Sequence, residues 1–391
     1  MQREIAIAGC GVAGLACATL LTRQGARCVV YDKLDAPRPL GSGLILQPVG
    51  LHVLDCIGAG ARLRALGAPI ERLYGLSGRR VVLDVRYADR GRAAQMGLGV
   101  HRGALFEALY DAAREAGVAF ETGREIVAAG DGVLSFADGR RSARFDLVID
   151  ALGAWSPLSR RAAPLDFGAL WANLDWIEGF DDSALEQRYE GAHKMAGVLP
   201  IGRVRADAPS QAAYFWSLRR DAYAAWRAAP LEAWKRDACA LWPETTLYLD
   251  HIRAHDDLVF ASYAHRTLAD PVGPRIAHVG DAWHCTSPQL GQGANMALLD
   301  ALALARAFES QTNLDAALGE YARLRAWHIR LYQTASFLFT PAYQSDSRAY
   351  AWVRDWLMAP LARVPPAPRL LAALVAGELV GGPKGSGHLS D

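Results

Sequence analysis

Three glycines lie at fixed spacing near the amino terminus, between a short apolar run and a longer apolar stretch. Residues 4–8 predict a strand, residues 9–14 are Gly-Cys-Gly-Val-Ala-Gly, and residues 15–24 predict a helix that Gly25 ends. The next segment, 27–31, is apolar at its centre, which is typical of a strand buried on both faces of a parallel sheet. The sequence therefore predicts a β-α-β unit, and this restricts the beginning of the chain to an α/β fold.

This glycine pattern, between a strand and a helix, predicts a dinucleotide-binding turn. Gly9 permits the tight turn, Gly11 lets the backbone approach a pyrophosphate, and Gly14 lets the helix pack on the strand. The helix amino terminus adds amide donors and partial positive charge. Asp32, after the second strand, is expected to accept hydrogen bonds from ribose hydroxyls. The residues assigned here to the cofactor, NAD or FAD, are Gly9, Gly11, Val12, Ala13, Gly14, Asp32 and Lys33.

A second glycine-containing segment, residues 275–300, lies far along the chain. Its pattern, a strand ending at Gly280-Asp281 and a loop with two glycines before a helix at 294–308, resembles the second flavin fingerprint of the group A flavoprotein monooxygenases. These are the FAD-dependent aromatic hydroxylases, such as p-hydroxybenzoate hydroxylase. A carboxylate at the strand end can bind the hydroxyls of a ribityl chain, and the helix amino terminus can stabilise the N1/C2=O edge of a reduced flavin. The predicted cofactor is therefore FAD.

The resemblance covers residues 1–165 and 265–325 and implies a role for each matching residue. Gly9, Gly11 and Gly14 resemble the family's pyrophosphate turn, and Asp32 resembles its ribose acid. Arg102, just before a predicted helix at 103–117, resembles the arginine that reaches the FAD phosphates or ribose; a surface cation near a helix end is the alternative. Around the flavin, the resemblance implies Asp281 as ribityl ligand, Pro288 at the flavin face, and a loop under the pyrimidine ring that consists of Gly291, Gln292, Gly293, Ala294 and Asn295.

One stretch departs from the family's pattern. There the family has an Asp-Gly pair followed by Ser and Arg, which contributes to both FAD and NAD(P)H binding. Here Leu152 stands where the acid is expected and Ser159 where the arginine is expected, with Arg160 one place later. The segment 150–153, Asp-Ala-Leu-Gly, is closer to related flavin reductases and halogenases. The departure argues against direct reduction of the flavin by NAD(P)H more than against FAD binding.

Tryptophans and tyrosines crowd into strand-like and short helical pieces after about residue 164, which predicts a second, β-rich domain. We therefore expect a Rossmann-like parallel-sheet FAD-binding domain interrupted by an antiparallel β-sheet substrate domain, with helices at the carboxyl end. Prolines at 365, 366 and 368 are expected to break the helical tail. The predicted boundaries are 1–73, 98–165 and 266–320 for the FAD-binding domain, 74–97 and 166–265 for the substrate domain, and 321–391 for the carboxyl-terminal helical region.

The strand-like segments 191–202 and 213–217 are candidates for the wall that faces the flavin. An aromatic, apolar wall suits a flat, uncharged substrate. His193 and Tyr214 could polarise or deprotonate a phenol, and Trp216 could contact the substrate. The alternative is that all three are structural, because aromatic residues at this density are commonly core residues. The sequence assigns no catalytic residue.

Composition sets further limits. With 391 residues and 51% apolar composition the chain can bury more than one core, and its net charge of +1 gives no overall attraction to nucleic acid or anionic membrane. Six scattered cysteines without a CxxC pair favour reduced thiols in the cytoplasm over a zinc site or disulfides. No apolar run is long enough to span a membrane, and glycine spacing explains residues 5–21 better than a signal peptide. A monomer or homodimer is expected.

The resemblance implies a reaction cycle in which NAD(P)H reduces FAD. O2 then forms a C4a-hydroperoxyflavin, which transfers one oxygen atom to an aromatic or other electron-rich apolar small molecule. A reductase or dehydrogenase that uses FAD on an apolar substrate without oxygen insertion is the second hypothesis. A non-catalytic flavin-binding protein is the third, and the two glycines at the ring argue against it. A halogenase is disfavoured because the chain has no Trp-x-Trp-x-Ile-Pro segment.

Overall fold

The computed structural model of the chain describes residues 2–36, 42–91 and 95–379. Its first sheet has the order β17-β18-β11-β1-β2-β8, and all neighbours pair in parallel except β17 with β18. The sheet consists of β1 (Glu4–Ala8), β2 (Arg27–Tyr31), β8 (Ala119–Glu121), β11 (Leu147–Asp150), β17 (Val272–Gly273) and β18 (Ile276–His278). The predicted β-α-β unit is its centre, because strands 4–8 and 27–31 pair directly.

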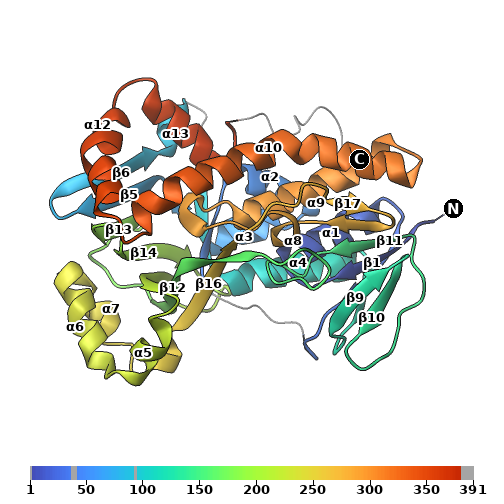
Figure 1. Cartoon of the computed structure of the whole chain (residues 1–391), viewed down its shortest axis with the longest axis horizontal. Coiled ribbons are helices and arrows are strands. Elements are labelled where there is room, and N and C mark those ends of the chain that lie inside the picture. The colour runs from blue at the N-terminus through green and yellow to red at the C-terminus, as the bar shows by residue number, and fades with distance from the viewer. Residues whose placement is uncertain (1, 37–41, 92–94, 380–391) are drawn as a thin grey trace.

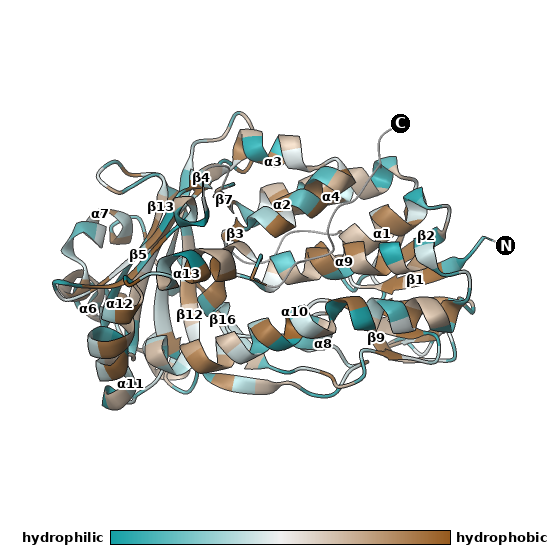
Figure 2. Cartoon of the chain, turned by 90° about the horizontal axis from the view of Figure 1, so that it is seen from above, coloured by the Kyte–Doolittle hydropathy of each residue, from teal (hydrophilic) through white to brown (hydrophobic). Residues whose placement is uncertain are grey.

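Both faces of this sheet are buried, as the continuous apolar strands require. Ile5, Ile7 and their neighbours pack against helices, whereas Ala6 and Ala8 pack against the hairpin of β9 and β10. Hydrophobic residues dominate α1 and β1 in Figure 2. The elements around the sheet are α1 (Val12–Arg23), α2 (Pro48–Ile57), α3 (Gly60–Leu66), α4 (Arg102–Glu115), α8 (Asp281–His284), η4 (Pro288–Leu290), α9 (Gly293–Ser310), β9 (Ile126–Gly130) and β10 (Val133–Phe136).

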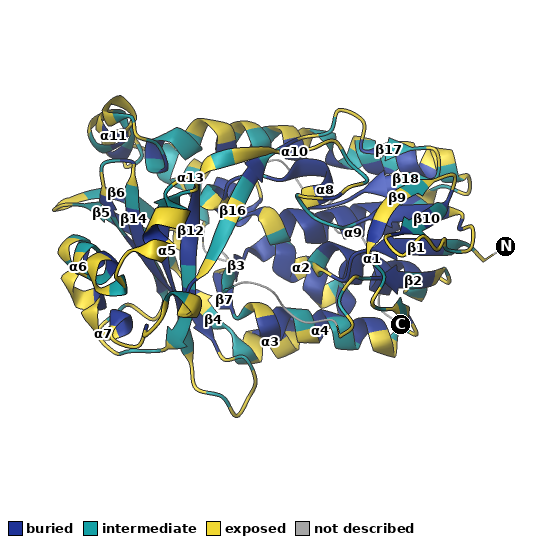
Figure 3. Cartoon of the chain, turned by 60° about the horizontal axis from the view of Figure 1, so that its bottom comes forward, coloured by how far each residue is buried: buried dark blue, intermediate teal, exposed yellow. Residues whose placement is uncertain are grey.

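The second sheet has seven strands in the order β16-β12-β15-β14-β13-β5-β6, antiparallel except for β13 with β5. Figure 3 shows its central strands β14 and β15 largely buried, with exposed residues on the small helices beside it. Its strands are β5 (Arg72–Ser77), β6 (Arg80–Arg86), β12 (Ala163–Asp175), β13 (Ala184–Glu190), β14 (Lys194–Gly202), β15 (Gln211–Arg219) and β16 (Val259–His265). The helices are α5 (Tyr223–Ala228), α6 (Leu231–Leu241), η2 (Pro243–Thr245), α7 (Thr246–Leu249) and η3 (His255–Asp257).

A small sheet, β3-β7-β4, lies between the two large sheets and contacts β14. It is formed by β3 (Leu44–Leu46), β4 (Ala68–Ile70) and β7 (Gly97–Val100), and the turn η1 (Tyr87–Arg90) follows β6. A parallel α/β sheet, antiparallel sheets and carboxyl-terminal helices are all present, so the predicted fold class is confirmed. The domain boundaries remain a prediction.

The carboxyl-terminal helices run back over both large sheets (Figure 1). They are α10 (Leu314–Tyr343), α11 (Arg348–Val353), the π-helical turn η5 (Arg354–Met358), α12 (Ala359–Leu361) and α13 (Ala367–Ala376). As expected, the helical run ends at Leu361 and the prolines break the tail, and a further helix, α13, then begins with Pro368 in its first turn. A proline costs no hydrogen bond at that position, since the first amides of a helix have no intrahelical partner. Within the described residues, no helix is both long and apolar enough to cross a membrane.

The turn between β1 and α1 depends on glycine because the backbones approach closely there. A Cβ on Gly14 would lie 2.0 Å from the carbonyl oxygen of Gly9, and Gly9 itself has φ +107° with a virtual Cβ 2.6 Å from the oxygen of Ala151. Neither obstacle is a flexible side chain. The turn can therefore bring α1 against the strand only with glycine at both positions.

Gly14→Ala is predicted to lower the free energy of unfolding by about 2 kcal/mol or more, because a methyl group has no room there. Gly319→Ala is the matched control, since Gly319 lies within α10 with no atom within 4 Å of a virtual Cβ. That change should stabilise the protein by about 1 kcal/mol, the usual helix preference for alanine. Urea unfolding of both variants checks this; equal effects would contradict the packing at Gly14.

Candidate functional site

One large cavity, of about 1490 Å3, lies between the parallel sheet and the seven-stranded sheet. It brings together the two glycine segments that the sequence singled out. The predicted cofactor residues that line it are Gly9, Gly11, Val12, Ala13, Asp32, Lys33, Arg102, Asp281, Pro288, Gly291, Gln292, Gly293 and Ala294. Gly14 and Asn295 do not line it. Gly14 is a packing position, and Asn295 is buried and supports the loop from behind.

At the amino-terminal loop, Asp32 orders the turn that would hold the pyrophosphate. Its two carboxylate oxygens accept hydrogen bonds from the amides of Cys10, at 2.8 Å, and Leu34, at 2.9 Å. Each oxygen keeps a free acceptor position for a ribose hydroxyl. Gly11 caps α1, and a virtual Cβ there meets no atom within 4 Å, so the backbone is open to the cavity. These features fit a dinucleotide.

Arg102 and Asp281 both line the cavity. Arg102 is the first residue of α4 and Asp281 the first residue of α8, and both side chains are accessible from the cavity. Burial lowers the pKa of Arg102, and the charge of Asp281 opposes that shift. Burial raises the pKa of Asp281, while His284, Arg102 and Arg266 counteract it. An arginine and an aspartate, both predicted FAD ligands, therefore line the same cavity.

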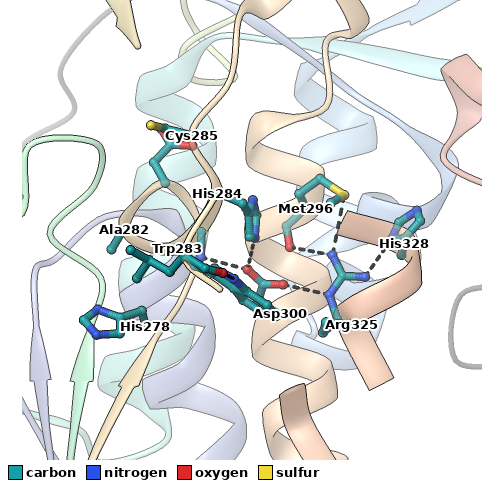
Figure 4. A network of polar contacts seen from close by, with 12 residues as sticks. His278, Ala282, Trp283, His284, Cys285, Met296, Asp300, Arg325 and His328 are labelled. Atoms are coloured by element: carbon teal, nitrogen blue, oxygen red, sulfur yellow. Dashed lines mark hydrogen bonds and ion pairs between the residues drawn. The ribbon is translucent and has the colours of Figure 1, made fainter. Parts of the chain in front are cut away.

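The turn that carries Asp281 is fixed by a buried carboxylate, Asp300 of α9 (Figure 4). Its Oδ2 accepts hydrogen bonds from the Gly280 amide, at 2.8 Å, and from His284 Nε2, at 2.6 Å. Its Oδ1 accepts one from Arg325 Nε, at 2.7 Å. Burial opposes ionisation of Asp300, but the charges and hydrogen bonds of His284 and Arg325 outweigh it and lower its pKa. The ionised carboxylate thus connects the cofactor loop with α10.

The network continues from Arg325 to the end of α13. Arg325 Nη1 donates to His328 Nδ1 at 2.6 Å, and His328 Nε2 lies 3.2 Å from the carbonyl oxygen of Gly377. Because arginine can only donate, Nδ1 must be the acceptor and the proton of His328 lies on Nε2. Burial and the Arg325 charge lower the pKa of His328 to about 3. His328 is therefore neutral in the folded protein.

Arg266 joins the cofactor loop to the stretch that departs from the family's pattern. Its Nη2 donates to the carbonyl oxygens of Asp281 and Ala282, and its Nη1 donates to those of Ala154 and Arg160. The side chain of Arg160 itself is exposed to solvent. Sequence reasoning did not single out Arg266, and no local motif marks it.

The neighbouring Asp150, at the end of β11, is also held by hydrogen bonds within the protein. It is fully buried and bonded to Ser156 Oγ, His278 Nδ1 and the Leu152 amide. Leu152 faces the cavity, where the family has an acid. The acid at position 150 therefore holds the loop rather than a cofactor, and it too was not singled out.

The structure places Tyr214, Trp216 and His193, the predicted substrate residues, outside the lining of this cavity. Tyr214 and Trp216 pack on the opposite face of β15, in a core with tryptophans of the small helices. His193 is exposed in the turn between β13 and β14, 3.8 Å from Glu190. Since side chains alternate along a strand, it is the intervening Phe215 that faces the cavity.

A family model described as an FAD binding domain matches residues 2–329. This chain belongs to that family. The match confirms the resemblance to the group A flavoprotein monooxygenases and identifies an FAD-dependent oxidoreductase of the monooxygenase type, with FAD as its cofactor. The matched range includes both segments that carried the resemblance.

Two relatives and one solved structure align with most of this chain. A probable 2-heptyl-3-hydroxy-4(1H)-quinolone synthase of Rhodococcus erythropolis is 26% identical over 374 residues, 93% of this chain and 92% of the relative. An FAD-dependent urate hydroxylase of Klebsiella pneumoniae is 28% identical over 350 residues, which cover 83% of this chain and 86% of the relative. The structure of a variant of Klebsiella pneumoniae HpxO, complexed with FAD, superposes with a TM-score of 0.78 at 19% identity, covering 98% of this chain and 100% of that one.

Asp281→Ala is predicted to purify largely colourless, with FAD affinity reduced about 100-fold, because two charge-assisted hydrogen bonds to the ribityl chain would be lost. Asp84→Ala is the matched control. Asp84 lines the far end of the same cavity and is paired with Arg72 at 2.7 Å, so its loss should leave the flavin bound. Flavin absorbance and titration of the apoprotein measure both; a yellow, tightly binding Asp281→Ala would exclude the proposed ligand role.

His328 is predicted to make the protein less stable as pH falls from 7 to 5. Its pKa is about 3 when folded and about 6.5 when unfolded, so below pH 6.5 the unfolded state binds the extra proton. Above pH 6.5 the contribution of neutral His328 to the free energy of unfolding is fully present. By pH 5 about 2 kcal/mol of it is lost. Urea unfolding of wild type and His328→Gln at both pH values tests this. An equal loss in both proteins would refute it.

Proposed function

We propose that this protein is an FAD-dependent monooxygenase that uses NAD(P)H and O2, through a C4a-hydroperoxyflavin, to hydroxylate a flat, uncharged aromatic or other electron-rich apolar small molecule. The observation that carries the proposal is the continuity of the cavity. Its polar half holds the predicted FAD residues, and it extends without interruption to an apolar wall on the seven-stranded sheet. A substrate against that wall would lie beside the flavin.

The wall is aromatic and aliphatic. Trp171 of β12 and Phe215 of β15 are cross-strand partners with ring centroids 4.6 Å apart. The side chains that line the cavity from β12 to β15 carry no charge: Ala169, Trp171, Leu185, Gln187, Tyr189, Met195, Leu199 and Phe215. The charged lining residues lie on other elements: Asp32, Lys33, Asp84, Arg102, Arg124, Glu125, Asp281 and Arg363. This composition favours a neutral substrate over an anion, which would need a cation here.

Among the wall's polar neighbours, Tyr263 is placed to orient such a substrate. Its hydroxyl accepts a hydrogen bond from Trp171 Nε1 at 2.9 Å, which leaves its own proton to donate to a carbonyl or hydroxyl. Burial raises the pKa of Tyr263 to about 12, so it stays protonated at neutral pH. We propose a positioning role, because a group with this pKa is a poor base.

Bound FAD would supply the two-electron chemistry and the activation of O2. The chain's own residues would do the rest. Asp281 and Arg102 would hold the cofactor, the amino terminus of α9 would stabilise negative charge that develops on it, and the apolar wall would exclude water from the reacting atoms. A location in the cytoplasm and a monomeric or homodimeric state remain predictions from the sequence.

The second candidate is an FAD-dependent reductase or dehydrogenase without oxygen insertion. It is favoured by one observation, that Leu152 faces the cavity at the position of the family's acid. Both candidates bind FAD and an apolar substrate, so only the fate of oxygen separates them.

The deciding experiment follows flavin absorbance with NADH and NADPH under anaerobic conditions, with and without candidate phenols or quinolones, and then admits 18O2. The monooxygenase is expected to show faster reduction with one aromatic compound and one 18O atom in its product. Conversion of the compound to a product that contains no 18O would establish the second candidate instead.

Phe215→Ala is predicted to lower kcat/KM for that compound about tenfold while FAD affinity stays unchanged, because the cavity loses an aromatic contact. Trp216→Phe is the control, since Trp216 packs in the core on the other face of the same strand. Equal losses in the two variants would show that the wall does not contact the substrate.

A further inference from the structure

The helices that follow α10 expose large apolar side chains to solvent. Trp352, Trp356 and Leu361 are 61%, 56% and 57% exposed, in a continuous helical run from Arg348 to Leu361. Figure 1 places α12 and α13 at one end of the molecule, beside β5 and β6. We call this surface the α11–α13 face, and its exposed apolar residues are Tyr350, Trp352, Trp356, Leu357, Leu361, Val364 and Leu370.

The exposed charges on the α11–α13 face are positive. Between residues 348 and 370 they are Arg348, Arg363 and Arg369. The one acid in this segment, Asp355, is only partly exposed and is bonded to Arg354 and to Ser77. A further exposed arginine, Arg80 at the start of the adjacent β6, lies 3.7 Å from the ring centroid of Trp356.

The face borders the cavity described above. Met358, Leu361, Arg363 and Leu370 line the cavity, and three of them are exposed at the surface as well. Arg363 also donates to the carbonyl oxygen of Val81, which holds the segment on β6. An apolar molecule that reached the face would therefore be at the edge of the cavity without crossing bulk water.

From this arrangement we propose that the α11–α13 face docks reversibly on the surface of an anionic lipid bilayer, from which an apolar substrate enters the cavity. Exposed tryptophan and leucine with arginine around them is the composition of segments that lie in a membrane interface. Arginine near an anionic surface adds attraction that falls with salt. The protein's net charge of +1 gives no overall attraction, so docking depends on this local patch.

A second copy of the chain fits the face less well. A twofold interface places the same surface on both subunits, so the arginines of one face would meet those of the other. No exposed acid between residues 348 and 370 would compensate them. An anionic headgroup layer supplies that compensation over the whole face.

The test is flotation of the FAD-loaded full chain with vesicles of phosphatidylcholine alone or mixed equally with phosphatidylglycerol. Wild type is expected to float with the mixed vesicles only, and less at 0.5 M than at 0.05 M NaCl. Leu357→Ser and the double variant Trp352→Ser/Trp356→Ser should bind about tenfold more weakly. Arg348→Gln should weaken binding to the mixed vesicles about fivefold.

Leu247→Ser is the matched control, because Leu247 is an equally exposed leucine on a short helix, α7, outside the face. It should bind vesicles like wild type. The flavin spectra of all variants should be unchanged, since none of the substituted residues lines the cavity. Binding is measured without substrate, so its failure would leave the proposed oxygenation untouched, and failure of oxygenation would leave docking untouched.

Absence of flotation, equal flotation with both vesicle types, or equal losses in Leu357→Ser and Leu247→Ser would overturn the proposal. A dimer that Leu357→Ser dissociates, together with no vesicle binding, would identify the face as a subunit interface and would overturn it too.

Discussion

The candidate active site depends on one buried carboxylate. Asp300 has no exposed surface, and an ionised carboxylate in that position is stable only because the Gly280 amide, His284 and Arg325 all donate to it. Removing any one donor would leave a buried charge undercompensated, at a cost of several kcal/mol. The geometry of the Gly280-Asp281 turn, and so the direction of the Asp281 side chain, follows from this set of bonds.

The same contacts tie the cofactor half of the cavity to its apolar rim. Arg325 reaches His328, which lies against the carbonyl oxygen of Gly377, just after α13, and Gln292 of the cofactor loop donates to Val375 within α13. A shift of α13 would therefore displace the loop that is predicted to lie under the flavin ring. This links the surface of the α11–α13 face, through the cavity wall, to the cofactor.

Much of the fold, and the meeting of the two glycine segments at one cavity, could be predicted because their signals are local. Five consecutive residues predict the strand at 27–31, and spacing alone marks Gly9 and Gly14. The face of β15 could not be predicted, because residues 212–216 are all apolar and both faces of that strand are buried. The pairing of Asp300 with Arg325 depends on contact between α9 and α10, which no local pattern encodes.

A crystal structure of the protein with FAD would show directly whether the two loops bind one cofactor. We expect the pyrophosphate against the amides of Gly11–Ala13, a ribityl hydroxyl bonded to Asp281, and the ring between the Pro288–Gly293 loop and the wall of Trp171 and Phe215. FAD bound by only one of the two loops, or with its ring outside the cavity, would contradict this expectation.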